Sequence, residues 1–347
     1  MGRPLRIWMP TIRSGSGADI FTERLAEGLR RVGHEPLVQW LDLRYEIAPW
    51  PLKKLEMPAG TDIIHTGCIP GFALRRKGVP LVVTEHQYLR HPAFLPYSTG
   101  LRRLYQRMLI HRYMARTYAL ADRIIAVSHH CADAMRDDLH RSVDVIHNWV
   151  DLDAFSPTST PRREQPFRLL FVGNPSPWKG SDILVPLARS LGADFTIEAM
   201  GGLRKAFVAD ASAPSNLQAA PSRATGDMPG AYAAADAVLV VSRYESFGYV
   251  ALEAMASSRP VVGFDAPGTS EVCINGSTAF LVPVDDVDAL ADACRRLADD
   301  RALAARLGAA GRERAVTTFA ERDAIERYVG VYREAKAELG KSSLARG

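Results

Sequence analysis

The chain has 347 residues, of which 47% are hydrophobic and 24% are charged. This composition is ordinary for a globular protein and excludes a fibrous or disordered chain, and the length is sufficient for two domains. The net charge of +4 arises from 43 Lys and Arg against 39 Asp and Glu, an excess too small to predict nucleic-acid binding by itself.

The first half of the chain predicts an alternation of strands and helices. A strand at 5–9 precedes a Gly/Ser loop at 14–17 and an amphipathic helix at 18–32, which Gly33 ends. Strands alternating with helices form a parallel sheet that is covered on both faces. Further short apolar runs, each predicted to be a strand, occupy 36–40, 62–65, 80–84, 123–127 and 143–146.

A second series of elements follows a change in composition. Residues 151–166 combine three prolines with Ser, Thr and charged residues, which is typical of a linker. Strands are then expected at 168–172, 194–199, 237–241 and 261–264, and a long helix at 320–339. In two-domain parallel α/β proteins, ligands bind at the carboxyl ends of strands and in the cleft between the domains. The loops that follow strands are therefore the places to search for a site.

A basic segment occupies residues 101–116 in the first half. It carries Arg102, Arg103, Arg107, Arg112 and Arg116 and no acidic residue. Leu101, Leu104, Tyr105, Met108 and Leu109 recur in it at helical spacing, which predicts an amphipathic helix with a basic face. Two interpretations remain open, a solvated outer face and a surface that attracts an anionic membrane or an anionic acceptor.

Neither membrane insertion nor secretion is expected. No apolar run approaches the ~20 residues that span a bilayer, and the first twelve residues lack the apolar region and cleavage site of a signal peptide. The cysteines lie far apart without CxxC spacing, so we expect neither a disulfide framework nor a structural zinc site. These features favour the cytoplasm. The cysteines are Cys68, Cys131, Cys273 and Cys294.

The segment 242–256, SRYESFGYVALEAMA, follows a predicted strand and begins a helix. Gly248 at the helix start lets backbone N–H groups approach an anion, which the helix dipole also favours. Glu245 in the turn and Glu253 in the helix supply carboxylates, which accept hydrogen bonds from sugar hydroxyls. The segment thus predicts a site for phosphate and sugar, against the alternative of a capping acid and a surface glutamate.

The same segment resembles the E-x7-E motif of glycosyltransferase family 4, whose members are retaining enzymes with the GT-B fold. Glu245, Phe247, Gly248, Glu253 and the run 254–256 match that motif. The similarity extends over about residues 5–335, because other matching motifs occur in family order. These are the glycines after the first strand, Gly33-His34-Glu35, Ala121-Asp122, Asn148, Trp178-Lys179-Gly180, Ala235-Asp236, Pro260-Val261-Val262, Gly268 with Glu271 and Gly276, and Leu281-Val282-Pro283.

The resemblance implies an α/β GT-B protein, with two Rossmann-like domains facing each other across a cleft. It assigns 1–160 to an acceptor-side domain, 161–320 to a nucleotide-sugar-binding domain, and 321–347 to a helix that returns to the N-terminal domain. The implied enzyme is a retaining, metal-independent hexosyltransferase that uses a nucleotide-sugar donor, UDP being the most frequent nucleotide. No cofactor and no nucleic-acid partner are implied.

The acceptor is expected to be a small molecule or a glycan, and a natural product or aminocyclitol is favoured because the chain is compact. Variable loops at 41–58 and 88–100 are expected to border the acceptor. Residues 200–202 and 223–229 are expected to border the donor base. Peripheral membrane contact is a further expectation, resting on the basic segment.

The resemblance also implies roles for individual residues. Glu253 would bind the ribose hydroxyls and Glu245 the donor sugar, while Lys179 would neutralise the diphosphate as the glycosidic bond breaks. The implied catalytic residues are His86, Lys179 and Glu245. The implied donor-binding residues are Gly15, Gly17, Asn174, Lys179, Phe247, Gly248, Tyr249, Val250 and Glu253. No residue is implied to bind a metal.

One position departs from the family pattern. The family usually has Arg after the glycine that ends the strand before the Lys179 loop, but this chain has Asn174, which donates hydrogen bonds without charge. Either the donor is held less tightly, or another cation meets the phosphate charge. The candidates are Arg13, Arg204, Lys205 and Arg243.

The sequence leaves two alternatives to a transferase open and disfavours a third. A GT-B nucleotide-sugar epimerase and a non-catalytic nucleotide-sugar-binding protein both remain open. A nicotinamide oxidoreductase is disfavoured, because Ile20 replaces the third glycine of the dinucleotide fingerprint. Two D-x-D patterns, at 151–153 and 286–288, are interpreted as helix or turn caps rather than metal ligands.

Overall fold

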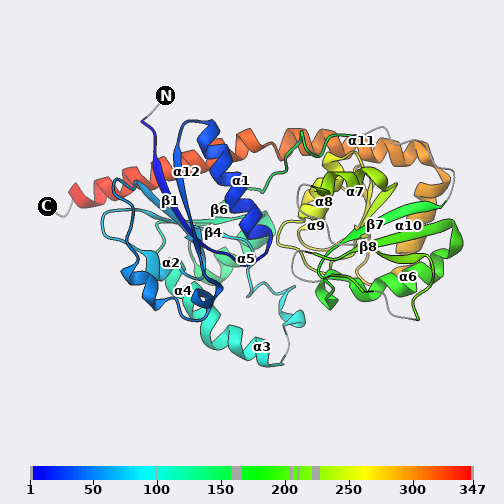
Figure 1. Ribbon diagram of the computed structural model, residues 1–347, viewed down its shortest axis with the longest axis horizontal. Coiled ribbons are helices and arrows are strands. Elements are labelled where there is room, and N and C mark those ends of the chain that lie inside the picture. Colours follow the sequence, from blue (N-terminus) through cyan, green and yellow to red (C-terminus); the bar gives the residue numbers. More distant parts are fainter. Residues whose placement is uncertain are drawn as a thin grey trace. The chain divides into compact units, whose positions relative to one another are not determined.

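The computed structural model describes residues 3–98, 100–157, 166–202, 206–208, 212–220 and 227–344. The chain divides into two compact units (Figure 1). One comprises Met1–Asn148 with Glu321–Gly347, and the other comprises Trp149–Ala320. This division lies before the boundary expected at 160, and residues 158–165 of the expected linker fall outside the described residues.

The N-terminal unit is built on a parallel six-stranded sheet in the order β2-β1-β3-β4-β5-β6. The apolar runs in the sequence correspond to these strands, because a parallel strand covered on both faces is apolar along its whole length. The strands are β1 (Arg6–Ile12), β2 (Glu35–Leu41), β3 (Ile63–Gly67), β4 (Leu81–Glu85), β5 (Arg123–Ala126) and β6 (Asp144–Val145).

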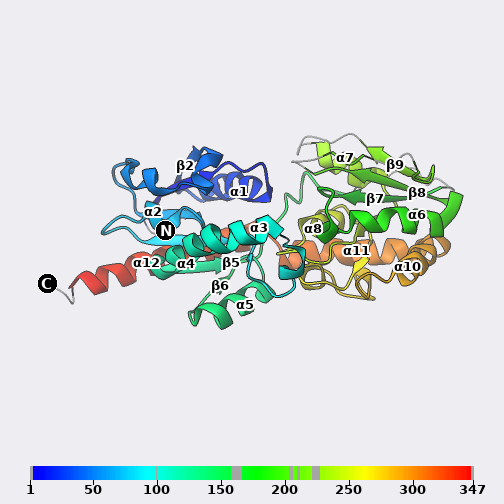
Figure 2. The same cartoon turned by 90° about the horizontal axis from the view of Figure 1, so that it is seen from below.

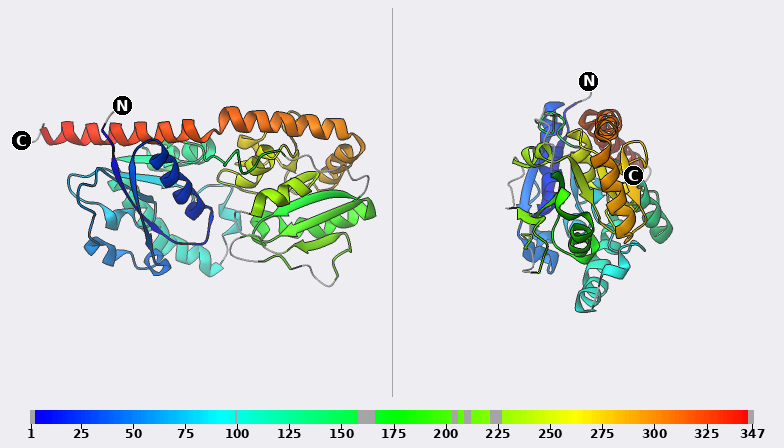
Figure 3. Two further views of the ribbon diagram at one scale, coloured as in Figure 1. Left: turned by 45° about the horizontal axis from the view of Figure 1, so that its top comes forward. Right: turned by 90° about the vertical axis from the view of Figure 1, so that its right-hand side faces the viewer.

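Helices cover both faces of this sheet. Side chains of three helices form one buried cluster with Trp8, Ile64 and Val83 on one face. On the other face α1 and α12 lie close together, since a Cβ added at Gly28 of α1 would meet Ile325 of α12 at 2.4 Å. The helices of the unit are α1 (Gly17–Arg31), α2 (Gly71–Leu74), α3 (Gly100–Tyr105), α4 (His111–Leu120), α5 (His129–Leu139) and α12 (Glu321–Leu344). Figure 3 shows α12 as the long red helix beside α1. The short helical turns are η1 (Leu43–Glu46), η2 (Trp50–Lys54), η3 (Leu95–Tyr97) and η4 (Gln106–Ile110).

The basic segment differs from the single regular helix expected at 101–116. It consists of α3, a π-helical turn η4 (Gln106–Ile110) and α4. The wider π turn changes which residues face inward. Leu104 and Met108, expected on the apolar face, are exposed, whereas Gln106 and Ile110 are buried.

The C-terminal unit has a second parallel six-stranded sheet, in the order β12-β11-β10-β7-β8-β9. Two of its strands, β9 and β12, were not expected, and β9 has two exposed residues at its centre. The strands are β7 (Phe167–Val172), β8 (Phe195–Met200), β9 (Leu217–Ala220), β10 (Ala237–Val240), β11 (Val261–Phe264) and β12 (Ala279–Val282).

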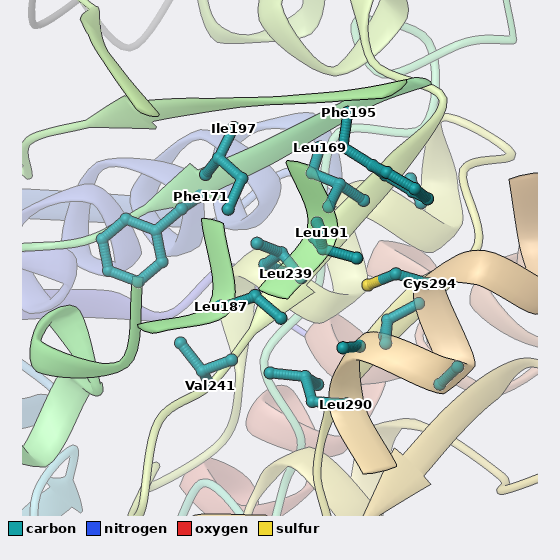
Figure 4. Close-up of a cluster of buried hydrophobic side chains, with 14 of the residues drawn as sticks. Leu169, Phe171, Leu187, Leu191, Phe195, Ile197, Leu239, Val241, Leu290 and Cys294 are labelled. Atoms are coloured by element: carbon teal, nitrogen blue, oxygen red, sulfur yellow. The ribbon is translucent and has the colours of Figure 1, made fainter. Parts of the chain in front are cut away.

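The core of this unit lies between the sheet and helices α6 and α10 (Figure 4). Leu169, Phe171 and Leu239 from the strands pack there against Leu187 of α6 and Leu290 of α10. Figure 2 shows α7 on the opposite face of the sheet from α6. The helices are α6 (Leu184–Leu191), α7 (Met228–Ala234), α8 (Tyr249–Ala256), α9 (Thr269–Val272), α10 (Val287–Asp299) and α11 (Arg301–Thr318), with short turns η5 (Pro177–Lys179), η6 (Ser181–Ile183) and η7 (Gly192–Asp194).

Both sheets contain a point at which the strand order reverses. In the C-terminal unit β7 continues to β8 on one side and pairs with β10 on the other. The loops that follow such a pair of strands run in opposite directions, which opens a crevice at the carboxyl edge of the sheet. Proteins with α/β folds bind ligands in this crevice. Within the part of the chain that the structure describes, no helix has the length and apolar character needed to cross a membrane.

Candidate functional site

The loops that follow β7 and β10 meet at the carboxyl edge of the C-terminal sheet. The chain leaves β7, turns through η5 and reaches Gly180, which has φ +71°. A Cβ at Gly180 would lie 2.0 Å from the carbonyl oxygen of Val241, directly after β10. The amide of Arg243 also donates to the carbonyl of Trp178 at 2.8 Å. These backbone contacts place Lys179 beside the end of β10.

Lys179 and Glu245 form an ion pair at this position. The Lys179 Nζ atom lies 2.6 Å from Oε1 of Glu245, and Ser242 Oγ donates to the same oxygen at 2.7 Å. Both members of the pair are largely buried, which strengthens their attraction relative to a pair in water. The Glu245 amide donates to the carbonyl of Pro267 at 3.0 Å, so the backbone of the turn is fixed as well.

Helix α8 begins directly after this turn. Gly248, at φ +99°, precedes its first residue, Tyr249, and as a glycine it supplies no side-chain cap to the helix. The first-turn N–H groups of a helix point outward along its axis and can donate to an anion. Phe247 is buried and packs edge-on against Tyr249 and Phe319, so its backbone, not its ring, faces the site.

Glu253 lies farther along α8 and is oriented by a tyrosine. The hydroxyl of the fully buried Tyr232, on α7, donates to Oε2 of Glu253 at 2.7 Å. A carboxylate has two oxygens that together accept several hydrogen bonds, so this contact leaves acceptor capacity for a ligand hydroxyl. Glu253 is therefore a positioned carboxylate, not a freely rotating surface side chain.

Arg243, one of the candidate cations to replace the usual arginine, is held by two aspartates. Its guanidinium binds both oxygens of Asp182, at 2.8 and 2.7 Å, and Asp285 at 2.7 Å. These bonds raise the pKa of Arg243 and join three loops, which is a structural role. The backbone of Gly202 lies against Asn174, since a Cβ there would meet its side chain at 2.8 Å.

The remaining candidate cations lie either in the N-terminal unit or outside the described residues. The guanidinium carbon of Arg13 lies 5.1 Å from the ring centroid of Trp40, in the N-terminal unit. Arg204 and Lys205 lie outside the described residues, as does 223–226 of the segment expected to border the base. Lys179 is therefore the candidate cation that the described structure places beside Glu245.

In the N-terminal unit, the glycine loop after β1 is closed by Asp19. The carboxylate of Asp19 accepts from the amides of Ser14 at 3.1 Å and Gly15 at 2.7 Å. Gly15 has φ +64°, a conformation that glycine adopts without strain, and Gly17 is the first residue of α1. A phosphate approaching these amides would have to compete with Asp19.

His86 follows β4 at the same edge of the N-terminal sheet. Its ring packs against Phe21 with centroids 4.3 Å apart. Burial lowers the pKa of His86 to about 4, and Asp19 opposes this shift only in part, so the imidazole is neutral near pH 7. The preceding residue, Glu85, accepts from the amide of Gln87 at 2.7 Å and from the Tyr118 hydroxyl, which holds the turn that carries His86.

A buried hydrogen-bonded network connects this strand end to the last helix. Tyr332 of α12 lies 2.7 Å from Nδ1 of His65, and the other ring nitrogen of His65 lies 2.8 Å from the hydroxyl of Thr84. Burial, and to a smaller extent the neighbouring His86, lowers the pKa of His65 to about 3. Helix α12 is therefore joined to β3 and β4, two residues before His86.

The D-x-D patterns have local structural roles. Asp286 is the N-cap of α10 and accepts from the amide of Ala289 at 2.9 Å. Asp151 accepts from the amides of Asp153 and Ala154 at 3.0 and 2.9 Å. Both carboxylates thus act as the caps that the sequence predicts.

Four residues that position the candidate side chains are not among the sequence-predicted site residues. Ser242 could have been recognised, because it stands three residues before Glu245 at a strand end. Tyr232, Asp19 and Phe21 carry no motif, and their proximity to Glu253, the glycine loop and His86 arises only from folding.

Comparison with known families gives two consecutive matches. Residues 154–314 match the family described as glycosyl transferases group 1, and residues 38–154 match glycosyltransferase family 4. Together the two matches cover most of both units.

Relatives of known name are similar along most of the chain. It is 30% identical over 319 residues to D-inositol 3-phosphate glycosyltransferase 1 of Catenulispora acidiphila, covering 81% of this chain and 74% of that protein. It is also 30% identical over 312 residues to a D-inositol 3-phosphate glycosyltransferase of Pseudarthrobacter chlorophenolicus, covering 78% and 72%.

Solved structures share the fold at lower sequence identity. Sucrose-phosphate synthase from Thermosynechococcus elongatus has a TM-score of 0.79 at 19% identity, over 96% of this chain and all of that one. Anabaena HepE, solved in complex with UDP and glucose, has a TM-score of 0.75 at 18% identity, over 94% of this chain and 99% of that one.

Proposed function

The chain belongs to glycosyltransferase family 4, retaining enzymes of GT-B fold that transfer a sugar from a nucleotide sugar, and we propose that its donor is a UDP-hexose and its acceptor a small cyclitol. The observation that carries this proposal is the placement of Lys179, Glu245 and Glu253 around the carboxyl edge of the C-terminal sheet. One cation, one helix N-terminus and two oriented carboxylates match a ligand that combines phosphate with hydroxyl groups.

The choice of UDP rests on chemistry and on a relative in fold. HepE is described in complexes with UDP and with UDP-glucose. In this chain, Glu253 would accept hydrogen bonds from the ribose hydroxyls, and the amides of Gly248, Tyr249 and Val250 would donate to the diphosphate. Phe247 would contribute its backbone amide, and Asn174 would donate from its side-chain amide. Gly15 and Gly17 stay predicted phosphate ligands, and a phosphate bound at their loop would have to displace Asp19 from the amide of Gly15.

The choice of acceptor rests on the named relatives. They act on D-inositol 3-phosphate, which is a phosphorylated ring of hydroxyl groups. We place the acceptor against the N-terminal unit, beside His86 and the loop that follows it. A neutral imidazole can donate one hydrogen bond and accept another, so His86 suits a sugar or cyclitol hydroxyl.

The proposed reaction proceeds on one face of the donor sugar without a covalent enzyme intermediate. The bond between the anomeric carbon and the phosphate oxygen breaks, and its electron pair leaves with the nucleoside diphosphate. The acceptor oxygen bonds to the anomeric carbon from the same side, and its proton passes to the departing phosphate oxygen. Lys179 stabilises the charge that develops on that phosphate, and Glu245 holds the sugar.

The test is a product assay with purified protein. UDP-glucose, UDP-N-acetylglucosamine and GDP-mannose are each incubated with D-inositol 3-phosphate, with inositol, or without acceptor, and each reaction is run with and without a chelator. We expect one UDP-sugar to give a glycoside whose anomeric configuration, read by NMR, is that of the donor. Turnover with GDP-mannose alone would overturn the choice of UDP, and loss of turnover on chelation would overturn the metal-independent mechanism.

The same assay separates the two alternatives. An epimerase would change the donor sugar in the reaction without acceptor, whereas a binding protein would retain affinity for the nucleotide and give no product. Calorimetric titration with UDP, run beside the product assay, distinguishes absence of turnover from absence of donor binding.

A further inference from the structure

The ring of Trp178 lies against the ammonium group of Lys179. The Lys179 Nζ atom is 5.3 Å from the centroid of the indole, a distance at which the electron-rich face of an aromatic ring attracts a cation. Tryptophan offers the strongest contact of this kind among the aromatic side chains. Trp178 stands in the same sequence motif as Lys179 and Gly180, but the site described above gives its side chain no role.

The backbone around Trp178 is held in place by Arg243. The Arg243 amide donates to the carbonyl of Trp178 at 2.8 Å, and the Arg243 guanidinium donates to the carbonyl of Pro177. The following Gly180, at φ +71°, packs so closely on the backbone after β10 that no side chain would fit there. These contacts fix the turn η5, so the indole starts from a defined backbone position beside Lys179.

The Lys179 ammonium therefore has contacts with two different groups. Glu245 accepts a hydrogen bond from it at 2.6 Å, and the indole comes from the same turn that carries the lysine. An ammonium has three N–H donors, so one bond to Glu245 leaves donors that a phosphate can use. The Lys179 side chain is 20% exposed, which leaves it accessible to a ligand oxygen.

The ring can restrain the ammonium in a way that the carboxylate cannot. A bound diphosphate and Glu245 are both anionic, so they would compete for the same cation. A lysine has a flexible four-carbon stem, and its ammonium moves readily when one partner is exchanged for another. The indole is neutral, so it attracts the cation without repelling the phosphate.

We infer that Trp178 is a positioning residue, whose ring holds the Lys179 ammonium where the leaving phosphate gains charge. This inference rests on the role proposed above for Lys179. A charge that is already in position stabilises a transition state better than one that must be ordered during the reaction. The ring should therefore affect kcat more than donor binding, because UDP would also be held by Glu253 and the first amides of α8.

The test compares two replacements of Trp178, using steady-state kinetics with the active UDP-sugar and calorimetric titration with UDP. Trp178→Leu removes the aromatic face and keeps an apolar side chain, so it should lower kcat about tenfold and change the UDP dissociation constant less than about twofold. Trp178→Phe keeps a smaller ring and should stay within about threefold of the wild-type kcat. Equal losses of kcat in the two variants, or an effect on the dissociation constant alone, would overturn the inference.

Fluorinated tryptophans at position 178 separate electrostatic attraction from shape. Fluorine withdraws electron density from the face of the ring and changes its size little, so it weakens the attraction for a cation. Introduced by codon suppression, one, two and three ring fluorines should lower kcat step by step. A kcat that does not respond to fluorination would show that the ring acts by packing alone, and would overturn the inference.

A double-mutant cycle tests whether the ring acts through the lysine. In the Lys179→Met background, Trp178→Leu should change kcat by less than about twofold, whereas fully additive losses would overturn the inference. A near-wild-type kcat for Lys179→Met alone would overturn the proposed role of Lys179 and this inference with it. A slow Lys179→Met beside an unimpaired Trp178→Leu would overturn this inference alone.

The matched control is a second cation–ring contact in the same unit. The guanidinium carbon of Arg296 lies 4.4 Å from the ring centroid of Phe280, and neither residue belongs to the candidate site. Phe280→Leu removes that ring and should leave kcat unchanged, with circular dichroism confirming that each variant is folded. A loss of kcat as large as that of Trp178→Leu would show that any lost ring contact slows the enzyme, and would overturn the inference.

Discussion

The ammonium group of Lys179 and the carboxylate of Glu245 are held 2.6 Å apart by loops that leave two neighbouring strands, 66 residues apart in sequence. Ser242 donates to the same carboxylate oxygen, so the pair is oriented from the end of β10 as well as from the loop after β7. The carboxylate restrains a flexible lysine side chain at the place where phosphate charge would develop. Electrostatic stabilisation is more effective when the charge is already in position.

Replacing Lys179 by Met should therefore lower kcat far more than it weakens donor binding. Loss of one preorganised charge-stabilising group costs about 10²–10³ in rate. Steady-state kinetics with the active UDP-sugar give kcat, and calorimetric titration with UDP gives the dissociation constant. Turnover within a few-fold of the wild type would show that Lys179 does not stabilise the leaving group.

Tyr232→Phe should weaken donor binding through Glu253. The lost hydrogen bond to a charged group corresponds to about 1.5–3 kcal/mol at most, and the carboxylate retains its ligand contact, so we expect about a tenfold rise in the UDP dissociation constant. The maximal rate should change little, because neither group touches the breaking bond.

A double-mutant cycle with Glu253→Gln checks that assignment. If Tyr232 acts by orienting Glu253, removing its hydroxyl in the Glu253→Gln background should add almost nothing. Fully additive losses would show that the tyrosine affects binding by another route, such as packing of α7 against Phe155.

Gly268→Ala should disturb the turn that carries Glu245. Gly268 has φ +84°, and a Cβ there would lie 2.4 Å from the carbonyl oxygen of Glu245 and 2.7 Å from its Cβ. Gly276, at φ +75°, has open space around the same position and is the matched control. Gly276→Ala should cost about 1–2 kcal/mol of stability from backbone strain alone. Gly268→Ala should cost more and also lower activity, which urea unfolding and the product assay measure; equal effects would contradict the steric argument.

Much of the fold was predictable, because parallel strands that are covered on both faces stand out as short apolar runs. The runs at 80–84 and 237–241 predicted β4 and β10 to within one residue at each end. β9 was not predictable, since its sequence, LQAA, is neither strongly apolar nor alternating. The basic helix was predicted with its apolar face in the wrong phase, because a π-helical turn cannot be recognised from a 3.6-residue period.

The candidate site was predictable only where a motif extends along the chain. Glu245 and Glu253 share one local segment, so their spacing predicts a turn and a helix face. The ion pair of Glu245 with Lys179, and the contact of Glu253 with Tyr232, join residues from different elements. Tertiary packing sets both contacts. For the same reason Arg243 remained a candidate phosphate ligand until its bonds to Asp182 and Asp285 were known.

The buried His65 should make the N-terminal unit less stable in acid. Burial holds its pKa at about 3 in the folded protein, against 6.5 for an ordinary histidine, so the unfolded chain binds a proton between those values that the folded chain does not. The contribution of His65 to the free energy of unfolding is therefore fully present above pH 6.5. It is lost as the pH decreases toward 3, by up to about 1.4 kcal/mol per pH unit. Urea unfolding at pH 7.5 and 5.5 measures how steeply the free energy of unfolding depends on pH.

The His65→Gln variant is the control. It should be less stable than the wild type at pH 7.5, because the contacts with Tyr332 and Thr84 are altered, but should lose less stability between the two pH values. Parallel pH dependence in the two proteins would show that another group causes the acid sensitivity.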